Sequence, residues 1–159
     1  MNLVIDVGNT NIKCAVFKDG VIHRLIRLEP KDFNSGVESL LGQENINKGI
    51  ISSVGKLDQE NHDFLKHYPF IVFLNHDFIL PFSNLYSTPS TLGLDRIALA
   101  AAAVHKYPSQ NVLVIDAGTC VTYDFINSKS EYLGGAISPG LTLRYKSLNN
   151  FTANLPLLA

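Results

Sequence analysis

Two short stretches of this chain place an aspartate at the end of an apolar run and follow it with glycine and threonine. "LVIDVGNT" covers 3–10 and "LVIDAGT" covers 113–119, so Asp6 and Asp116 lie 110 positions apart. Glycine lets a backbone approach a ligand closely, and amides and threonine hydroxyls in such turns can hold phosphate oxygens. A carboxylate at this point suits Mg²⁺, which prefers carboxylate and water oxygens. The two turns therefore predict a site for a polyphosphate.

A simpler interpretation is that both turns only close β-hairpins, with aspartate and asparagine bonding to their own turn backbone. Either turn taken alone is equally compatible with this interpretation. Because both turns stand at the same place in a repeated strand pattern, the phosphate site is favoured.

A third stretch, Gly93-Leu94-Asp95-Arg96, lies near the start of an alanine-rich segment. A carboxylate there can accept a proton from an attacking hydroxyl, and an adjacent arginine can hold an anionic substrate through its rigid fork of donors. The structural alternative is that Asp95 stabilises the positive end of a helix dipole while Arg96 is a surface cation. Composition alone favours this alternative.

The first half of the chain predicts a mixed sheet covered by helices. Its predicted elements are strands at 2–7, 12–18 and 21–29, a helix at 30–43, a strand at 49–54, a helix at 57–68 and a strand at 69–75. Asp19-Gly20 is a hairpin signal, and Phe33, Val37 and Leu40 follow helical spacing. The predicted order is βββαβαβ.

The second half begins as the first does. A loop at 76–91 precedes a helix at 91–107, which its alanines favour. The further predicted elements are strands at 111–118, 120–126 and 131–137 and a helix at 140–150. The sequence thus predicts an α/β fold with a duplicated unit, at 1–90 and 91–159, whose second copy is cut short.

Four motifs in order carry a resemblance to a known family: "DVGNTNIK", "TLGLDRIALAAAA", "VIDAGTCVTYD" and "YLGGAISPGL". Over essentially all of 1–159 the chain resembles type III pantothenate kinase, within the superfamily of acetate kinase, sugar kinases, Hsp70 and actin. The resemblance implies two ribonuclease H-like (actin-like ATPase) domains with ATP in the cleft between them, and a homodimer.

The resemblance also implies an activity and the residues that perform it. The expected reaction is ATP-dependent phosphorylation of pantothenate to 4'-phosphopantothenate, the first step of coenzyme A biosynthesis. Asp95 is the expected proton acceptor, Asp6 the expected Mg²⁺ ligand, and Asp116 the expected ligand of a monovalent cation, K⁺ or NH₄⁺. The expected phosphate-binding residues are Asp6, Val7, Gly8, Asn9, Thr10, Asn11, Ile12, Lys13 and Thr119, and the expected pantothenate-binding residues are Tyr86, Gly93, Leu94, Asp95 and Arg96.

Other functions remain open at this stage. The chain could be a non-catalytic ATP-binding or regulatory accessory protein with the same fold, an inactive fragment of a kinase, or a kinase acting on another small hydroxylated substrate. Members of the family are longer than this chain, so we expect its second sheet to expose strand edges and an apolar face, which favours aggregation or pairing with another chain.

Composition limits the partners. Hydrophobic residues make up 46% of the chain and charged residues 17%, enough for an apolar core. The net charge is −1 and no Lys/Arg run occurs, which gives no support to a nucleic-acid partner. No apolar run approaches the roughly 20 residues that span a bilayer. With Met1-Asn2-Leu3 unlike a signal peptide, we expect a cytoplasmic protein without membrane contact.

Several common motifs are missing from the sequence. It contains no G-x-x-x-x-G-K-[ST] and no G-x-G-x-x-G stretch. Cys14 and Cys120 lie in strand-like runs without metal spacing, and we expect both to be reduced thiols. The histidines, which also lack metal-ligand spacing, are His23, His62, His67, His76 and His105.

Overall fold

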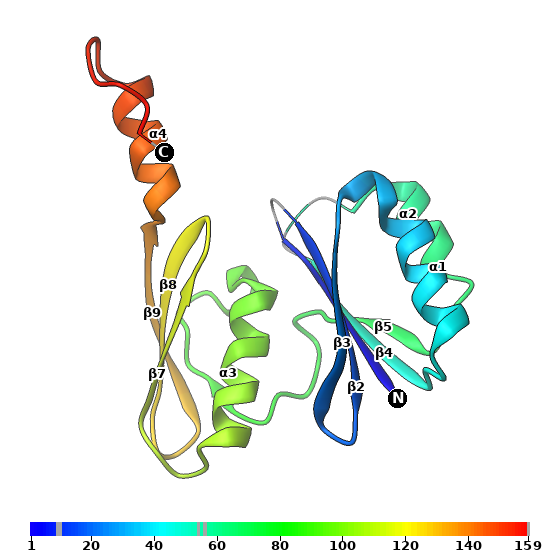
Figure 1. Ribbon diagram of the computed structural model, residues 1–159. Helices are drawn as coiled ribbons and strands as arrows, with labels where there is room; N and C mark the ends of the chain where they lie inside the picture. The colour runs from blue at the N-terminus through cyan, green and yellow to red at the C-terminus, as the bar shows by residue number, and fades with distance from the viewer. Residues whose placement is uncertain (9–10, 54, 56, 159) are drawn as a thin grey trace. The chain divides into compact units, whose positions relative to one another are not determined.

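The computed structural model describes residues 1–8, 11–53, 55 and 57–158. Contacts within the chain divide it into two compact units. The first consists of Met1–Phe78 with Gly93–Asp95, and the second of Ile79–Leu92 with Arg96–Ala159. Each unit contains one β-sheet together with helices, so the fold is a mixed α/β fold with two sheets (Figure 1).

The sheet of the first unit has five strands in the order β3-β2-β1-β4-β5. Their bounds are β1 Asn2–Val7, β2 Ile12–Lys18, β3 Val21–Leu28, β4 Lys48–Ser53 and β5 Ile71–Phe73. The first three strands form an antiparallel meander, and β4 and β5 continue the sheet parallel to β1. With the two helices described next, the order along the chain is the predicted βββαβαβ.

Helices α1 (Phe33–Gln43) and α2 (Gln59–Leu65) lie together on one face of this sheet (Figure 1). Alternate side chains of the strands point toward them, as the pleat of a strand requires. Each fully buried aliphatic or aromatic side chain stabilises the fold by about 1.5–3 kcal/mol. The buried core contains Leu3, Ile5, Val7, Ile12, Cys14, Val16, Phe33, Val37, Leu40, Ile51, Leu65 and Ile71.

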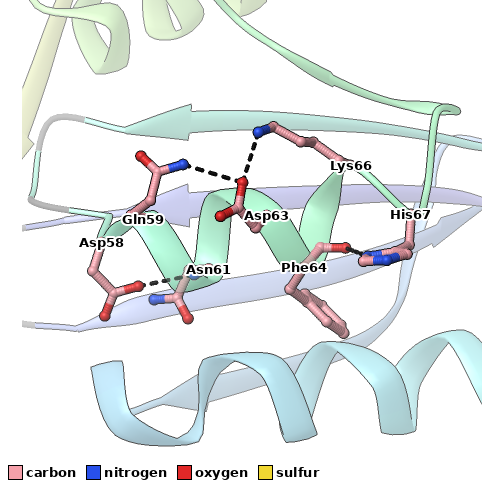
Figure 2. Close-up of polar contacts among 7 residues, drawn as sticks. All are labelled: Asp58, Gln59, Asn61, Asp63, Phe64, Lys66 and His67. Atoms are coloured by element: carbon pink, nitrogen blue, oxygen red, sulfur yellow. Dashed lines mark hydrogen bonds and ion pairs between the residues drawn. The ribbon is translucent and has the colours of Figure 1, made fainter.

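Helix α2 begins after an aspartate that caps it (Figure 2). The Asp58 carboxylate accepts a hydrogen bond from the Asn61 amide at 2.8 Å. Further along the helix, the exposed Asp63 carboxylate accepts hydrogen bonds from Gln59 at 3.1 Å and from Lys66 at 2.6 Å. The contact with Asp58 gives a hydrogen-bond acceptor to the Asn61 amide, which has no partner within the helix itself.

Replacing the capping residue, Asp58→Ala, is expected to lower the free energy of unfolding by about 1 kcal/mol, because that amide loses its acceptor. Urea unfolding followed by circular dichroism measures the change. Asp63→Ala is the matched control, because it removes a carboxylate from the same helix at a solvent-exposed ion pair. A loss at Asp63 as large as the loss at Asp58 would contradict the capping role.

Cys14 lies in the core of the first unit and is 1% exposed. Burial raises the pKa of its thiol to about 12, from an ordinary value of 9.0, because the thiolate is poorly solvated there. Both cysteines of the chain are free thiols, as expected.

The raised pKa of Cys14 predicts a loss of stability at alkaline pH. Between pH 9 and pH 12 the unfolded chain releases the thiol proton while the folded chain keeps it, so stability falls as the pH rises. The expected slope is about 1.4 kcal/mol per pH unit in this window. Urea unfolding at pH 8.5 and 10.5 tests this, and Cys14→Ala should show a shallower pH dependence. Equal slopes in the two proteins would rule out this contribution.

The sheet of the second unit has four strands in the order β6-β9-β8-β7. Their bounds are β6 Ser83–Asn84, β7 Val112–Ala117, β8 Cys120–Ile126 and β9 Glu131–Pro139. The last three, which correspond to the three predicted strands, form an antiparallel meander, and β6 adds to β9 in parallel. β6 falls within the stretch predicted as a loop, and its two residues are too few to give a strand pattern.

Helix α3 (Leu94–Lys106) and helix α4 (Leu141–Asn150) complete the second half of the chain. α3 buries Ile97, Ala100 and Ala103, while α4 buries none of its side chains. Within the described part of the chain, no helix has both the length and the apolar character needed to cross a membrane.

Candidate active site

Gly8 and Asn11, which lie between β1 and β2, share a backbone hydrogen bond. The amide of Gly8 donates a hydrogen bond to the carbonyl of Asn11 at 3.1 Å. A Cβ at position 55 would lie 2.5 Å from the Gly8 carbonyl oxygen, so only glycine fits at Gly55. Asn9 and Thr10, which the sequence assigns to phosphate binding, lie outside the described residues.

Asp6 shares one face of the first sheet with two polar neighbours. Its partners in register are Lys13 on β2 and Ser52 on β4. The Lys13 Nζ lies 3.5 Å from Asp6 Oδ2, and their side chains are 53% and 39% exposed. The Ser52 hydroxyl is buried and has no hydrogen-bond partner among the described residues. An exposed ion pair of this kind is weak, so both charges can be offered to a ligand.

This arrangement fits a magnesium ion that is brought in by a nucleotide. Mg²⁺ in such sites is held by one or two carboxylates, by phosphate oxygens and by water. In the described ranges no three His, Cys, Asp or Glu side chains gather into a group that could hold a metal. A single carboxylate, Asp6, beside a cation and a hydroxyl therefore fits a metal–phosphate complex better than a metal held by protein alone.

Two backbone hydrogen bonds hold the turn between β7 and β8. The amide of Gly118 donates to the carbonyl of Cys120 at 2.9 Å, and the amide of Gly140 donates to the carbonyl of Thr119 at 2.9 Å. A Cβ at position 140 would lie 2.2 Å from the Gly118 carbonyl oxygen. The backbone of Gly140 therefore packs directly on this turn.

Asp116 lies one residue before the end of β7, opposite Thr122 of β8. The Thr122 hydroxyl is buried and has no hydrogen-bond partner in the part of the chain that the structure describes. A carboxylate and a hydroxyl thus neighbour each other on one face of the second sheet. Both are oxygen donors, the ligand type that alkali cations take in proteins, so the pair fits the expected monovalent cation.

Leu94, Asp95 and Arg96 lie in the first turn of α3, and Gly93 directly precedes the helix. Asp95 is half-buried in the first turn of the helix, where a negative charge is favoured by the helix dipole. Arg96 is only 6% exposed. The structural alternative that made Arg96 a surface cation is therefore wrong.

Arg96 is bound to a buried carboxylate of β8. Its Nε and Nη2 lie 2.8 Å and 2.6 Å from Asp124 Oδ1, and the Tyr132 hydroxyl donates to the same oxygen at 2.5 Å. Asp124 and Tyr132 have no solvent-exposed surface. Burial alone would lower the pKa of Arg96, but the hydrogen bond and charge of Asp124 more than offset it, so this pKa is raised.

Tyr86 lies beside this ion pair. The Arg96 guanidinium carbon is 6.0 Å from the centre of the Tyr86 ring, and the Tyr86 and Tyr132 rings are 6.3 Å apart at a steep angle. The structure thus brings together Tyr86 and Arg96, two residues that the sequence assigns to substrate binding. Asp124 and Tyr132 were missed, although a lone aspartate in the strand "CVTYDFI" is the signal that could have revealed the first.

The other expected site residues divide by exposure. Val7 and Ile12 are each 2% exposed, so their side chains belong to the core and only their backbone can face a ligand. Asn11 and Thr119 are exposed. Gly93 and Leu94 are half-buried at the beginning of α3.

Comparison with known proteins identifies the family of the chain. The sequence model of the family described as type III pantothenate kinase matches residues 2–159. The chain is 47% identical over 159 residues to a type III pantothenate kinase of Flavobacterium psychrophilum. It is 53% identical over 160 residues to one of Christiangramia forsetii. These matches cover 99% of this chain but only 66% and 65% of the relatives, so the chain spans about two thirds of their length.

A solved structure from Campylobacter jejuni, described as a Baf family transcriptional activator, has a similar fold. The TM-score is 0.59 at 25% sequence identity, and the match covers 94% of this chain and 60% of that one. Because the family's sequence model matches the chain from residue 2 to residue 159, the chain belongs to the type III pantothenate kinase family.

Proposed function

We propose that this chain catalyses the ATP-dependent phosphorylation of pantothenate to 4'-phosphopantothenate, the first step of coenzyme A biosynthesis. The observation that carries the proposal is the pairing of Tyr86 with Arg96 directly after Asp95, in a chain of this family. A buried cation beside a half-buried aromatic ring, directly after a half-buried carboxylate, suits a small molecule that bears both a carboxylate and a hydroxyl.

The nucleotide side of the reaction is assigned to the two aspartate turns. Asp6 would hold Mg²⁺, and Lys13 would contact phosphate oxygens, together with Thr119 and the backbone of 7–12. When bound, Mg²⁺ supplies neutralisation of the charge on the phosphoryl group being transferred. Asp116, with Thr122 beside it, would hold the monovalent cation, K⁺ or NH₄⁺.

The substrate side is assigned to the stretch from Gly93 to Arg96 and to Tyr86. Asp95 takes the proton of the pantothenate hydroxyl while the oxygen of that hydroxyl attacks the γ-phosphorus of ATP. ADP leaves with the electrons of the P–O bond that breaks. Arg96 attracts the carboxylate of pantothenate and so holds the hydroxyl in place. Positioning of this kind accounts for much of the rate in phosphoryl transfer.

An assay of ADP release with pantothenate, ATP, Mg²⁺ and K⁺ tests the proposal, with mass spectrometry of the product. Turnover that requires pantothenate is the expected result. A folded chain that binds ATP but shows no turnover would contradict it. Turnover with other small alcohols at a higher kcat/KM than with pantothenate would instead indicate a different substrate.

A second candidate is a non-catalytic regulatory protein with the same fold. One observation favours it, the similarity to a structure described as a Baf family transcriptional activator. A net charge of −1 argues against direct contact with nucleic acid. ATP binding without turnover in the assay above would favour this candidate.

We also propose that the two units are ribonuclease H-like domains of a cytoplasmic homodimer. The support for pairing is an apolar set of exposed side chains on the second sheet, namely Leu113, Ile115, Phe125 and Leu133. Exposed apolar patches of this kind mark interaction surfaces. Sedimentation velocity measures the mass in solution, and a monomer at all concentrations would exclude the dimer.

A further inference from the structure

The ion pair of Arg96 and Asp124 has an uneven distribution of hydrogen bonds. Asp124 Oδ1 accepts hydrogen bonds from Nε of Arg96 and from the Tyr132 hydroxyl, and Nη2 of Arg96 lies 2.6 Å from the same oxygen as an ion-pair contact. Asp124 Oδ2 is buried and has no hydrogen-bond partner among the residues that the structure describes. A bidentate pair would share the donors between both oxygens and would be the stronger arrangement. The observed arrangement therefore gives the Asp124 carboxylate weaker hydrogen bonding than a bidentate pair of the same two side chains would give.

Stability alone is a weak explanation for such a pair. Removing two charges from water costs about as much as their attraction returns, so a buried ion pair is often no better than apolar residues of the same volume. A buried oxygen without a partner adds a further cost. Local departures from good packing and hydrogen bonding are expected mainly at functional sites.

The arrangement fixes the orientation of the Arg96 guanidinium. The edge of the guanidinium that carries Nε and Nη2 faces Asp124, while Tyr86 lies beside the group. Tyr86 itself is held against β9, where Gly134 has a φ of +111° and a Cβ would lie 3.5 Å from the Tyr86 ring. Both side chains are thus anchored on strands of the second sheet.

We propose that Asp124, supported by Tyr132, is a positioning residue for substrate binding: it orients the Arg96 guanidinium beside Tyr86, so that both are in place before an anionic substrate arrives. A free arginine side chain loses rotamer entropy when it becomes fixed. Since Asp124 fixes the side chain during folding, the substrate does not bear that cost on binding. This inference rests on the proposed role of Arg96 in pantothenate kinase activity.

Steady-state kinetics of three variants test the inference. Asp124→Asn keeps the side-chain volume and removes the charge, and should raise KM for pantothenate at least tenfold while KM for ATP stays within twofold. Tyr132→Phe keeps the ion pair and removes one hydrogen bond, and should raise the same KM about twofold to fivefold. Ile126→Val is the matched control, because it trims a buried side chain of the same strand and should leave both KM values unchanged.

A second readout does not depend on activity. In proton-exchange NMR of the 159-residue chain, the Nε–H of Arg96 should exchange slowly with water, and at least tenfold faster in Asp124→Asn. The inference would be overturned if Nε–H exchange were equally fast in the unsubstituted chain and in Asp124→Asn, or if KM for pantothenate and KM for ATP changed equally. If Asp124→Asn does not fold, the same measurements on Tyr132→Phe decide the inference. If the unsubstituted chain does not phosphorylate pantothenate, the proposed function fails, while the exchange rate still decides whether Asp124 fixes Arg96.

Discussion

Asp95→Asn is expected to lower kcat for pantothenate phosphorylation by about 10²–10⁴-fold, the usual contribution of a positioned general base. Asparagine has nearly the same shape but no group that can take the hydroxyl proton. Because the substitution leaves Arg96 and Tyr86 in place, KM for pantothenate should change by less than about threefold. Single-turnover kinetics at saturating ATP separate the chemical step from product release.

The control for this substitution is Asp19→Asn in the hairpin between β2 and β3. Asp19 has a positive φ of 51°, a conformation that asparagine also adopts readily. Asp19→Asn also removes one negative charge, but at a residue that has no assigned role in binding or catalysis, so this variant should keep full activity. Undiminished turnover in Asp95→Asn would exclude Asp95 as the base.

Asp124→Ala is expected to lower the free energy of unfolding by about 3–5 kcal/mol, because it leaves a buried guanidinium without its counter-charge. That is a large share of the stability of an ordinary domain, about 5–15 kcal/mol. Thermal and urea unfolding of the purified chain measure the loss. A loss of only about 1 kcal/mol in the free energy of unfolding, the average for any substitution, would mean that Arg96 and Asp124 are not closely coupled.

Adding Arg96→Met to Asp124→Ala should recover much of this stability, because no unpaired charge then remains buried. The double-mutant cycle isolates the coupling between the two side chains. The recovered protein should still bind pantothenate poorly, since the cation assigned to its carboxylate is gone. The second substitution is thus expected to restore stability without restoring substrate affinity.

Hydrophobic periodicity accounts for the elements that could be predicted from the sequence. Strands β1, β2 and β3 and helix α1 follow clear two-residue or helical spacing, and the structure contains them near the predicted bounds. Helix α2 is shorter than the predicted 57–68, because Asp58 acts as its cap and the chain turns after Leu65. Helix α3 likewise begins at Leu94 rather than at residue 91, after a short turn of 3-10 helix.

The candidate site could be predicted only as far as residue type and spacing carry information. Glycine and aspartate after an apolar run revealed the two turns, and the motif around Asp95 revealed the start of α3. The neighbours of these residues depend on which strands lie side by side. Ser52 is beside Asp6 only because β4 pairs with β1 in that register, and no local pattern in the sequence indicates this. The same holds for the contact of Arg96 with Asp124.

The glycines at positions 55 and 140 lead to a criterion that can be read directly from other sequences. Each leaves no room for a Cβ, because a carbonyl oxygen of the neighbouring aspartate turn occupies the space. A related chain that keeps both aspartates but carries a side chain at either position must therefore hold that turn in another shape. Gly55 and Gly140 therefore distinguish chains that can form these two turns from chains that have only the aspartate motifs in their sequence.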